Sequence, residues 1–221
     1  TVVINGLNAP VTQSPATYIA TITVSDGFDE ASAKLSYTVI PNNDPVVVSP
    51  VADQVLNSAT TPVNVDISSV FSDPDGEPLN YSVAVSGSVV RANINGSELR
   101  ITPSAFGMDT VTLTATDMSS ASVSSVFTVL VRDGSKAADL YPNPVSDILN
   151  VRSGEATSSA SVRIMAANGA VVLEQDGLSM SPFSPAQIDV SSLAGGIYKV
   201  TVTYTTAGGN SRTITSDIAK L

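Results

Sequence analysis

The fold is decided by the stretch Thr110-Val111-Thr112-Leu113-Thr114-Ala115-Thr116, in which an apolar side chain follows each of the first three threonines. Alternation of this kind is typical of a β-strand that buries one face. Phe127, Val129 and Val131 continue the same pattern further along the chain. No long segment repeats its apolar residues with the helical period of about 3.6. The sequence therefore predicts an all-β chain.

Turn-forming residues gather between these runs. Gly, Pro, Asn and Asp cluster at 42–45, 73–76, 95–96, 168–169 and 208–210. Short strands separated by such clusters are typical of β-sandwiches.

The composition excludes several kinds of site. The 221 residues include no His, no Cys and no Trp. Ser-His-Asp and Cys-His catalytic groups and His/Cys zinc sites therefore cannot form within the chain. The only glycine-rich candidate for a phosphate cradle, Ala207-Gly208-Gly209-Asn210, lies between two strand-like runs and is expected to be a hairpin turn. We therefore expect no enzymatic activity.

The net charge of −10 lies mainly in the first part of the chain. Residues 1–139 carry 14 acidic and 5 basic side chains, whereas residues 140–221 carry 6 and 5. This balance disfavours binding to nucleic acid or to anionic lipid and favours divalent cations. No apolar run has the length of a membrane span, which needs about 18 residues.

An internal repeat links the start of the chain to its middle. Residues 21–26 align with 112–117, and residues 37–40 align with 127–130, at a spacing of one sandwich. Residues 1–43 then correspond to the C-terminal half of a truncated repeat. We expect the other half of this repeat to precede Thr1 in a longer protein.

Four blocks of sequence characterise residues 140–221. They are Tyr141-Pro142-Asn143-Pro144, Asp147-Ile148-Leu149-Asn150-Val151, Gly169-Ala170-Val171-Val172 and the segment from Ile188 to Val200. In this order they resemble the type A C-terminal sorting domain of type IX secretion substrates of Gram-negative bacteria. The resemblance implies export through the periplasm and the outer membrane to the cell surface or the medium.

The same resemblance implies a recognition site. Its candidate residues, for the translocon and its outer-membrane shuttle protein, are Pro142, Asn143, Pro144, Gly195, Gly196, Tyr198 and Lys220. An alternative is purely structural, because proline and glycine also shape the turns that a sandwich needs. Both roles can coexist. Tyr198 and Tyr204 could form a stacking platform, but their spacing on one strand favours the core.

Residues 134–139 lack a strand pattern and are expected to be a flexible linker. In the related substrates a surface sorting peptidase removes the sorting domain at such a junction. The resemblance therefore implies cleavage within Gly134, Ser135, Lys136, Ala137 and Ala138.

The middle module, 44–133, carries a second resemblance. Asn43-Asp44-Pro45 opens it, Phe71-Ser72-Asp73-Pro74-Asp75-Gly76 marks its middle, and Thr116-Asp117 follows near its end. This order is similar to that of bacterial cadherin-like and Ig-like tandem repeats.

The cadherin resemblance implies a calcium site formed by Asp44, Asp73, Asp75 and Asp117. Calcium prefers six to eight oxygen ligands, so clustered carboxylates suit it. The alternative is that Asp-Pro-Asp-Gly is a β-turn without metal. Asn95-Gly96-Ser97 likewise fits an N-glycosylation pattern but is favoured as a tight hairpin.

These observations predict tandem Ig-like or cadherin-like sandwiches that end in a sandwich-shaped sorting domain. The terminal domain would direct type IX export, and the upstream repeats would be a spacer or an adhesive stalk. Two alternatives remain: the repeats accompany a protease or glycan hydrolase encoded upstream, or they bind a glycan or protein themselves.

Overall fold

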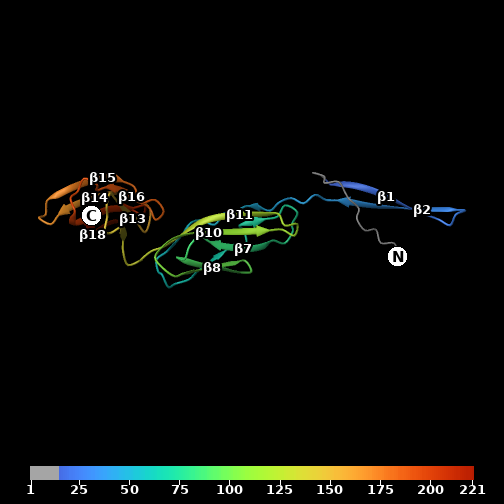
Figure 1. Ribbon diagram of the computed structural model, residues 1–221, viewed down its shortest axis with the longest axis horizontal. Coiled ribbons are helices and arrows are strands. Elements are labelled where there is room, and N and C mark those ends of the chain that lie inside the picture. The colour runs from blue at the N-terminus through green and yellow to red at the C-terminus, as the bar shows by residue number, and fades with distance from the viewer. Residues whose placement is uncertain (1–14) are drawn as a thin grey trace.

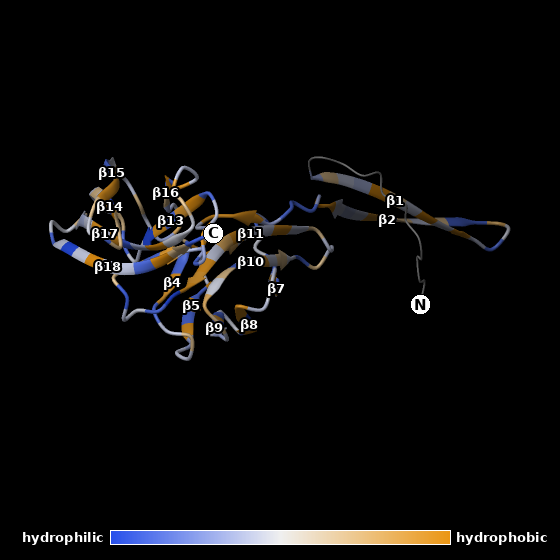
Figure 2. Cartoon of the chain, turned by 60° about the vertical axis from the view of Figure 1, so that its left-hand side comes forward, coloured by the Kyte–Doolittle hydropathy of each residue, from blue (hydrophilic) through white to orange (hydrophobic). Residues whose placement is uncertain are grey.

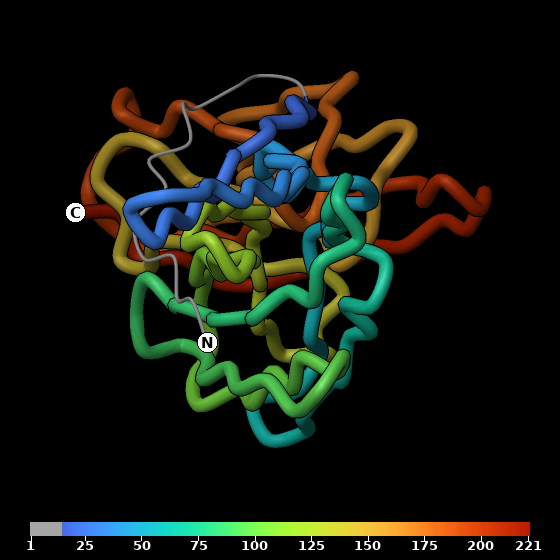
Figure 3. Tube along the Cα trace, turned by 90° about the vertical axis from the view of Figure 1, so that its right-hand side faces the viewer, coloured from blue at the N-terminus to red at the C-terminus, as the bar shows by residue number. Residues whose placement is uncertain are grey.

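The computed structural model describes residues 15–221, and every regular element within that range is a β-strand. The predicted all-β class is confirmed. The strands form three parts that follow one another along the long axis of the molecule, namely a hairpin, a first sandwich and a C-terminal sandwich (Figure 1). Figure 3 looks along this axis from the side of the hairpin. Residues 1–14, which the sequence analysis placed in the first repeat, lie outside the described residues.

The hairpin consists of β1 (Ala16–Ser25) and β2 (Glu30–Val39), which pair antiparallel along their full length. Each of its strands has ten residues, as have β10 and β11 of the first sandwich, and the aligned segments 21–26 and 112–117 each end one residue after β1 and β10 respectively. Several of its apolar side chains are exposed, including Ile19, Val24 and Leu35. Figure 2 shows apolar residues along the hairpin.

The first sandwich contains β3 to β11. Their bounds are β3 (Val46–Val47), β4 (Gln54–Leu56), β5 (Val63–Asp66), β6 (Phe71–Ser72), β7 (Asn80–Val85), β8 (Val90–Asn95), β9 (Glu98–Pro103), β10 (Gly107–Thr116) and β11 (Ser122–Val131). One sheet has the order β4-β11-β10-β7, a second has the order β5-β9-β8, and β3 pairs with β6. The predicted alternation is present in β10, where Val111, Leu113 and Ala115 are fully buried. Burying each Val or Leu side chain contributes roughly 1.5–3 kcal/mol.

The C-terminal sandwich contains β12 to β18. Their bounds are β12 (Ala138–Tyr141), β13 (Ile148–Ser153), β14 (Thr157–Ala166), β15 (Val171–Leu178), β16 (Ala186–Asp189), β17 (Gly196–Thr206) and β18 (Ser211–Lys220). A three-stranded sheet, β12-β13-β16, faces a four-stranded sheet, β15-β14-β17-β18. Both sheets contribute fully buried side chains, such as Leu149, Ile188 and Val200.

Predicted turns connect several of these strands. Residues 207–210 join β17 to β18, where the Thr206 amide donates to the Asn210 carbonyl at 2.9 Å. Asn95 and Gly96 lie at the tight turn between β8 and β9, and Gly96 adopts a φ of 61°, which a residue with a Cβ rarely takes. Within residues 15–221 there is no helix suited to crossing a membrane.

Candidate functional site

Asn143, in the loop between β12 and β13, contacts β18, the last of the described strands. Its Oδ1 accepts a hydrogen bond from the Ala219 amide at 2.9 Å, and its Nδ2 donates to the Asp217 carbonyl at 3.2 Å. Two residues later, the Val145 amide donates to the Ala219 carbonyl at 2.8 Å. The Val145 carbonyl in turn accepts from the Leu221 amide at 2.9 Å. This loop therefore forms a short parallel pairing with β18.

The loop before β17 reaches the same end of the sandwich. Gly196 pairs with Lys220 across the β17–β18 ladder. A Cβ added at Gly195 would lie 3.6 Å from the Lys220 carbonyl oxygen, which is ordinary contact. The Tyr198 hydroxyl donates to the Ala194 carbonyl at 2.8 Å and closes the loop.

Most of the predicted recognition residues are therefore neighbours in the structure. Pro142, Asn143 and Pro144 are exposed, and Asn143 lies against the strand that carries Lys220. Gly195 and Gly196 lie beside the same strand end. We call the surface formed by residues 142–144, 195–196 and 220–221 the recognition end.

The side chains of Tyr198 and Ile197 lie on opposite faces of β17, one buried and one exposed. Tyr198 is buried in the core, as is Tyr204, in agreement with the core interpretation of the tyrosine pair. The neighbouring Ile197 points outward with 61% of its surface exposed, and Leu221 is 71% exposed. Ile197 was not among the predicted recognition residues, although the alternation that buries Tyr198 also indicates that its neighbour faces solvent.

The junction between the sandwiches is held by Arg132. Its side chain is 6% exposed and lies 3.3 Å from the Asp139 carboxylate. It also donates to the Lys136 carbonyl at 2.7 Å and to Asn57 Oδ1 at 3.5 Å. Residues 134–139 were predicted to be flexible on composition alone, and these bonds give them a defined path.

The predicted cleavage region has an exposed first part and a second part that is bonded to the C-terminal sandwich or buried in it. Gly134, Ser135 and Lys136 are exposed. Ala137 accepts a hydrogen bond from the buried Tyr204 hydroxyl at 2.8 Å, and Ala138 is buried as the first residue of β12. Burial raises the pKa of the Tyr204 hydroxyl, which therefore stays protonated and able to donate.

An acidic cluster lies in the first sandwich. Asp73, Glu77 and Asp117 each place a carboxylate oxygen within 4.8 Å of the others. Asp73 and Asp117 are more than nine-tenths buried. Asp73 Oδ1 accepts from the Asp75 amide at 2.8 Å, whereas Asp73 Oδ2 and Glu77 Oε2 are buried without a hydrogen-bond partner. Unpaired buried carboxylate oxygens are costly, so a cation in their midst fits this donor set.

The other two predicted ligands lie outside this cluster. Asp75 is exposed, and its carboxylate accepts from the Asn43 backbone amide at 2.6 Å and from Asn43 Nδ2 at 2.8 Å. These two bonds hold the pKa of Asp75 below its usual range, and the bond from the Asn43 backbone amide has the larger effect. Asp44 is exposed. Glu77, which the sequence analysis did not select, takes the third position in the cluster.

Asn42 connects the hairpin side of the molecule to this cluster. Its side-chain amide donates to Asp117 Oδ2 at 2.8 Å, which lowers the pKa of Asp117 although burial opposes that shift. Asp117 therefore remains ionised beside two other carboxyl groups.

Comparison with protein families identifies both sandwiches. Residues 139–215 match the secretion system C-terminal sorting domain. Residues 42–130 match the bacterial Ig domain. No curated protein matches the sequence.

Solved structures give distant similarities. Latent dimeric PorU from Porphyromonas gingivalis is 12% identical over 94% of this chain and 29% of that chain, with a TM-score of 0.30. The human desmocollin-1 ectodomain is 13% identical over 92% and 44%, with a TM-score of 0.35. A nucleoside hydrolase-related protein from Saccharophagus degradans is 27% identical over 42% and 26%, with a TM-score of 0.32. The chain spans less than half the length of each of the three.

The bacterial Ig match covers the first sandwich, and the sorting-domain match covers most of the C-terminal sandwich. The sorting domain directs proteins through the type IX pathway of Gram-negative bacteria to the cell surface or the medium. The two matched domains are non-catalytic. The protein therefore carries a bacterial Ig domain followed by a type IX secretion C-terminal sorting domain, which is its signal for export across the outer membrane.

Proposed function

We propose that the type IX translocon and its outer-membrane shuttle protein recognise this chain at the recognition end. The observation that carries the proposal is the pair of bonds from Asn143 to the backbone of β18, which brings the 142–144 loop and the C-terminus into one surface. The exposed apolar side chains of Ile197 and Leu221 add a hydrophobic contact of the kind that protein interfaces use.

An Ile197→Ser substitution tests this proposal. The side chain is exposed, so folding should be nearly unaffected, whereas binding of the purified chain to the purified translocon and shuttle protein should weaken by about tenfold, which corresponds to one lost apolar contact. Val126→Ser is the matched control, because Val126 is 58% exposed on the Ig domain. Equal binding by both variants would contradict the proposal.

The surface sorting peptidase would act at the exposed part of the junction. Among the predicted cleavage residues, Gly134, Ser135 and Lys136 are accessible, whereas Ala137 and Ala138 are tied to the C-terminal sandwich. Cleavage there would release the sorting domain with β12 intact. Mass spectrometry of the mature surface protein tests this, and a C-terminus at Ala137 or beyond would contradict it.

The Ig domain and the hairpin before it would serve as a spacer or adhesive stalk. The support is the extended arrangement of the parts (Figure 1) and the non-catalytic nature of the matched domains. No observation favours a glycan site or an accessory role for an enzyme.

We also infer that the acidic cluster binds calcium. Asp73, Glu77 and Asp117 would be the ligands, and the unpaired oxygens of Asp73 and Glu77 support this set. When bound, the ion would neutralise the three carboxylates and stiffen the side of the domain that Asn42 contacts. Calorimetric titration of the whole chain with Ca²⁺ tests this inference, and no heat of binding at millimolar Ca²⁺ would contradict it.

A further inference from the structure

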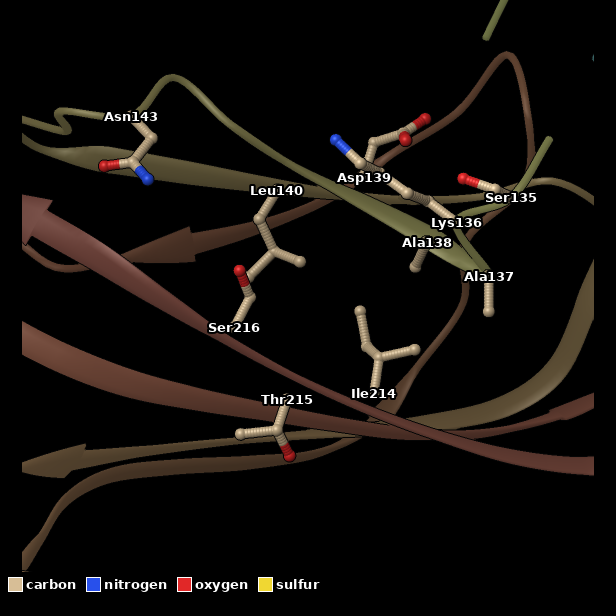
Figure 4. A pocket seen from close by; sticks show the side chains of 10 residues that line it. All are labelled: Ser135, Lys136, Ala137, Ala138, Asp139, Leu140, Asn143, Ile214, Thr215 and Ser216. Atoms are coloured by element: carbon tan, nitrogen blue, oxygen red, sulfur yellow. The ribbon is translucent and has the colours of Figure 1, made fainter. Parts of the chain in front are cut away.

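A groove of about 720 Å³ crosses one side of the C-terminal sandwich. Residues 135–140 form one wall, residues 214–216 of β18 form the other, and Asn143 stands at one end. In Figure 4, Leu140, Ile214 and Ser216 point into the space between the walls, whereas Thr215 points away from it. The groove is therefore lined by apolar and polar side chains together.

Both walls belong to sheet edges. β12 is the outer strand of the three-stranded sheet, and β18 is the outer strand of the four-stranded sheet. The outer edge of a sheet presents backbone N–H and C=O groups that have no partner within the sheet. Proteins use such edges to bind extended peptides.

The direction of the free groups on β18 follows from three hydrogen bonds. The Ala219 amide and carbonyl and the Asp217 carbonyl all bond to the 143–145 loop, away from β17. Because alternate residues of a strand point their backbone groups the same way, Thr213 and Thr215 also face outward. Within residues 15–221, no backbone hydrogen bond joins Thr213 or Thr215 to a residue on that side.

The chain itself already uses part of this edge. Val145 pairs in parallel with Lys220, and the chain then turns away to begin β13 at Ile148. The edge is therefore covered near its C-terminal end and open along 211–215. An edge that accepts Val145 in extended form has the geometry to accept further extended residues.

We propose that the open edge of β18 binds one extended strand of a protein of the export machinery. The strand would pair with the backbone of Thr213 and Thr215 and place an apolar side chain between Leu140 and Ile214. This proposal rests on the proposed recognition end, with which the groove is continuous through Asn143.

The wall formed by residues 135–140 limits what can bind along the edge of β18. Because residues 135–140 lie across from β18, an occupant of the groove lies between two walls. The edge of a second sandwich would meet the wall opposite β18. A single strand of a partner therefore fits better than a second copy of the chain.

A proline at Thr215 tests the pairing. Proline removes the outward N–H of an edge strand without removing a bond to the inner neighbour. Thr215→Ala is the matched control, because both variants lose the side-chain contact with Thr201 and only the proline loses the amide. Both are made in the full chain behind an exported fluorescent reporter. Thr215→Pro should reduce translocon-dependent export by about tenfold relative to Thr215→Ala, with similar melting temperatures, because the strand pairing is weakened.

Equal export of the two variants would overturn the proposal while leaving the recognition end intact. Export of the unaltered chain that does not depend on the translocon would overturn both. If the proline variant melts early, a photo-crosslinking residue at Thr213 replaces it. A crosslink to the translocon or the shuttle protein supports the proposal. A crosslink only to a second copy of the chain, or none while export proceeds, overturns it.

Discussion

Asn143 holds the backbone of Ala219 by a hydrogen bond of 2.9 Å, across 76 positions of sequence. The second bond from the same side chain, to the Asp217 carbonyl, fixes the amide orientation, because one end must accept and the other must donate. The loop before β13 and β18 are thus a single structural unit.

Replacing Asn143 by alanine should separate this unit. Two exposed hydrogen bonds are lost, so unfolding free energy should fall by only about 1 kcal/mol, whereas translocon-dependent export should fall strongly. Asn210→Ala is the control, because Asn210 lies in the β17–β18 turn at the opposite end of β17 and its side chain makes no bond among the described residues. Thermal melts and secretion assays check both effects. Export of the Asn143 variant at the level of the control would contradict the role of the recognition end.

Removing the Arg132 side chain should open the junction. Arg132→Ala leaves the Lys136 carbonyl and the Asp139 carboxylate without their cation, at a cost of about 2 kcal/mol. Limited proteolysis should then cut within 134–137 faster than in the unaltered chain. Arg163→Ala is the control, because the exposed Arg163–Glu174 pair should contribute less than about 1 kcal/mol. Unchanged cleavage at the junction would show that Arg132 does not hold it.

Asp73→Asn should change the response to calcium in a way that identifies the ligands. In chelator the variant should melt higher than the unaltered chain, because one of three clustered negative charges is gone. In Ca²⁺ it should lose the stabilisation that a ligand of the native state confers. Asp75→Asn should keep that stabilisation, since Asp75 bonds to Asn43 instead. Loss of the stabilisation in both variants would instead favour the ligand set predicted from sequence, which includes Asp75.

Acid should destabilise the C-terminal sandwich through Asp189. The Ser191 hydroxyl and amide hold the pKa of Asp189 below its usual value of 3.8. Because the folded state prefers the ionised form, this contribution is present above that value and is lost as the pH falls through the lowered pKa. Melting temperature measured in chelator between neutral and strongly acidic pH should fall less steeply for Asp189→Asn than for the unaltered chain. Parallel curves would show that Asp189 does not contribute.

Much of the fold follows from local pattern. The alternation in 110–116 places Val111 and Leu113 in the core because a strand has only two faces. The turn at 207–210 follows from glycines between two strand patterns. Composition also indicated the absence of familiar catalytic groups.

The site depended on contacts that pattern does not encode. Asp75 was expected as a ligand from the cadherin resemblance, yet its carboxylate accepts hydrogen bonds from Asn43, and Glu77 is the third member of the acidic cluster. The order of residues along the 73–77 turn does not determine which of its carboxylates lies close to Asp117, which is 40 residues after Glu77 along the chain. Arg132 similarly orders a segment whose own residues are small and polar, because its partners come from both sandwiches.

Export of a reporter tests the central claim most directly. A fluorescent protein with a signal for export to the periplasm is fused to the full chain, and its location is compared in a type IX-competent bacterium and in a translocon-deficient strain. The account predicts reporter in the medium or on the surface of the first strain only. Intact, folded fusion retained in the periplasm of both strains would contradict the assignment of the C-terminal sandwich as the export signal.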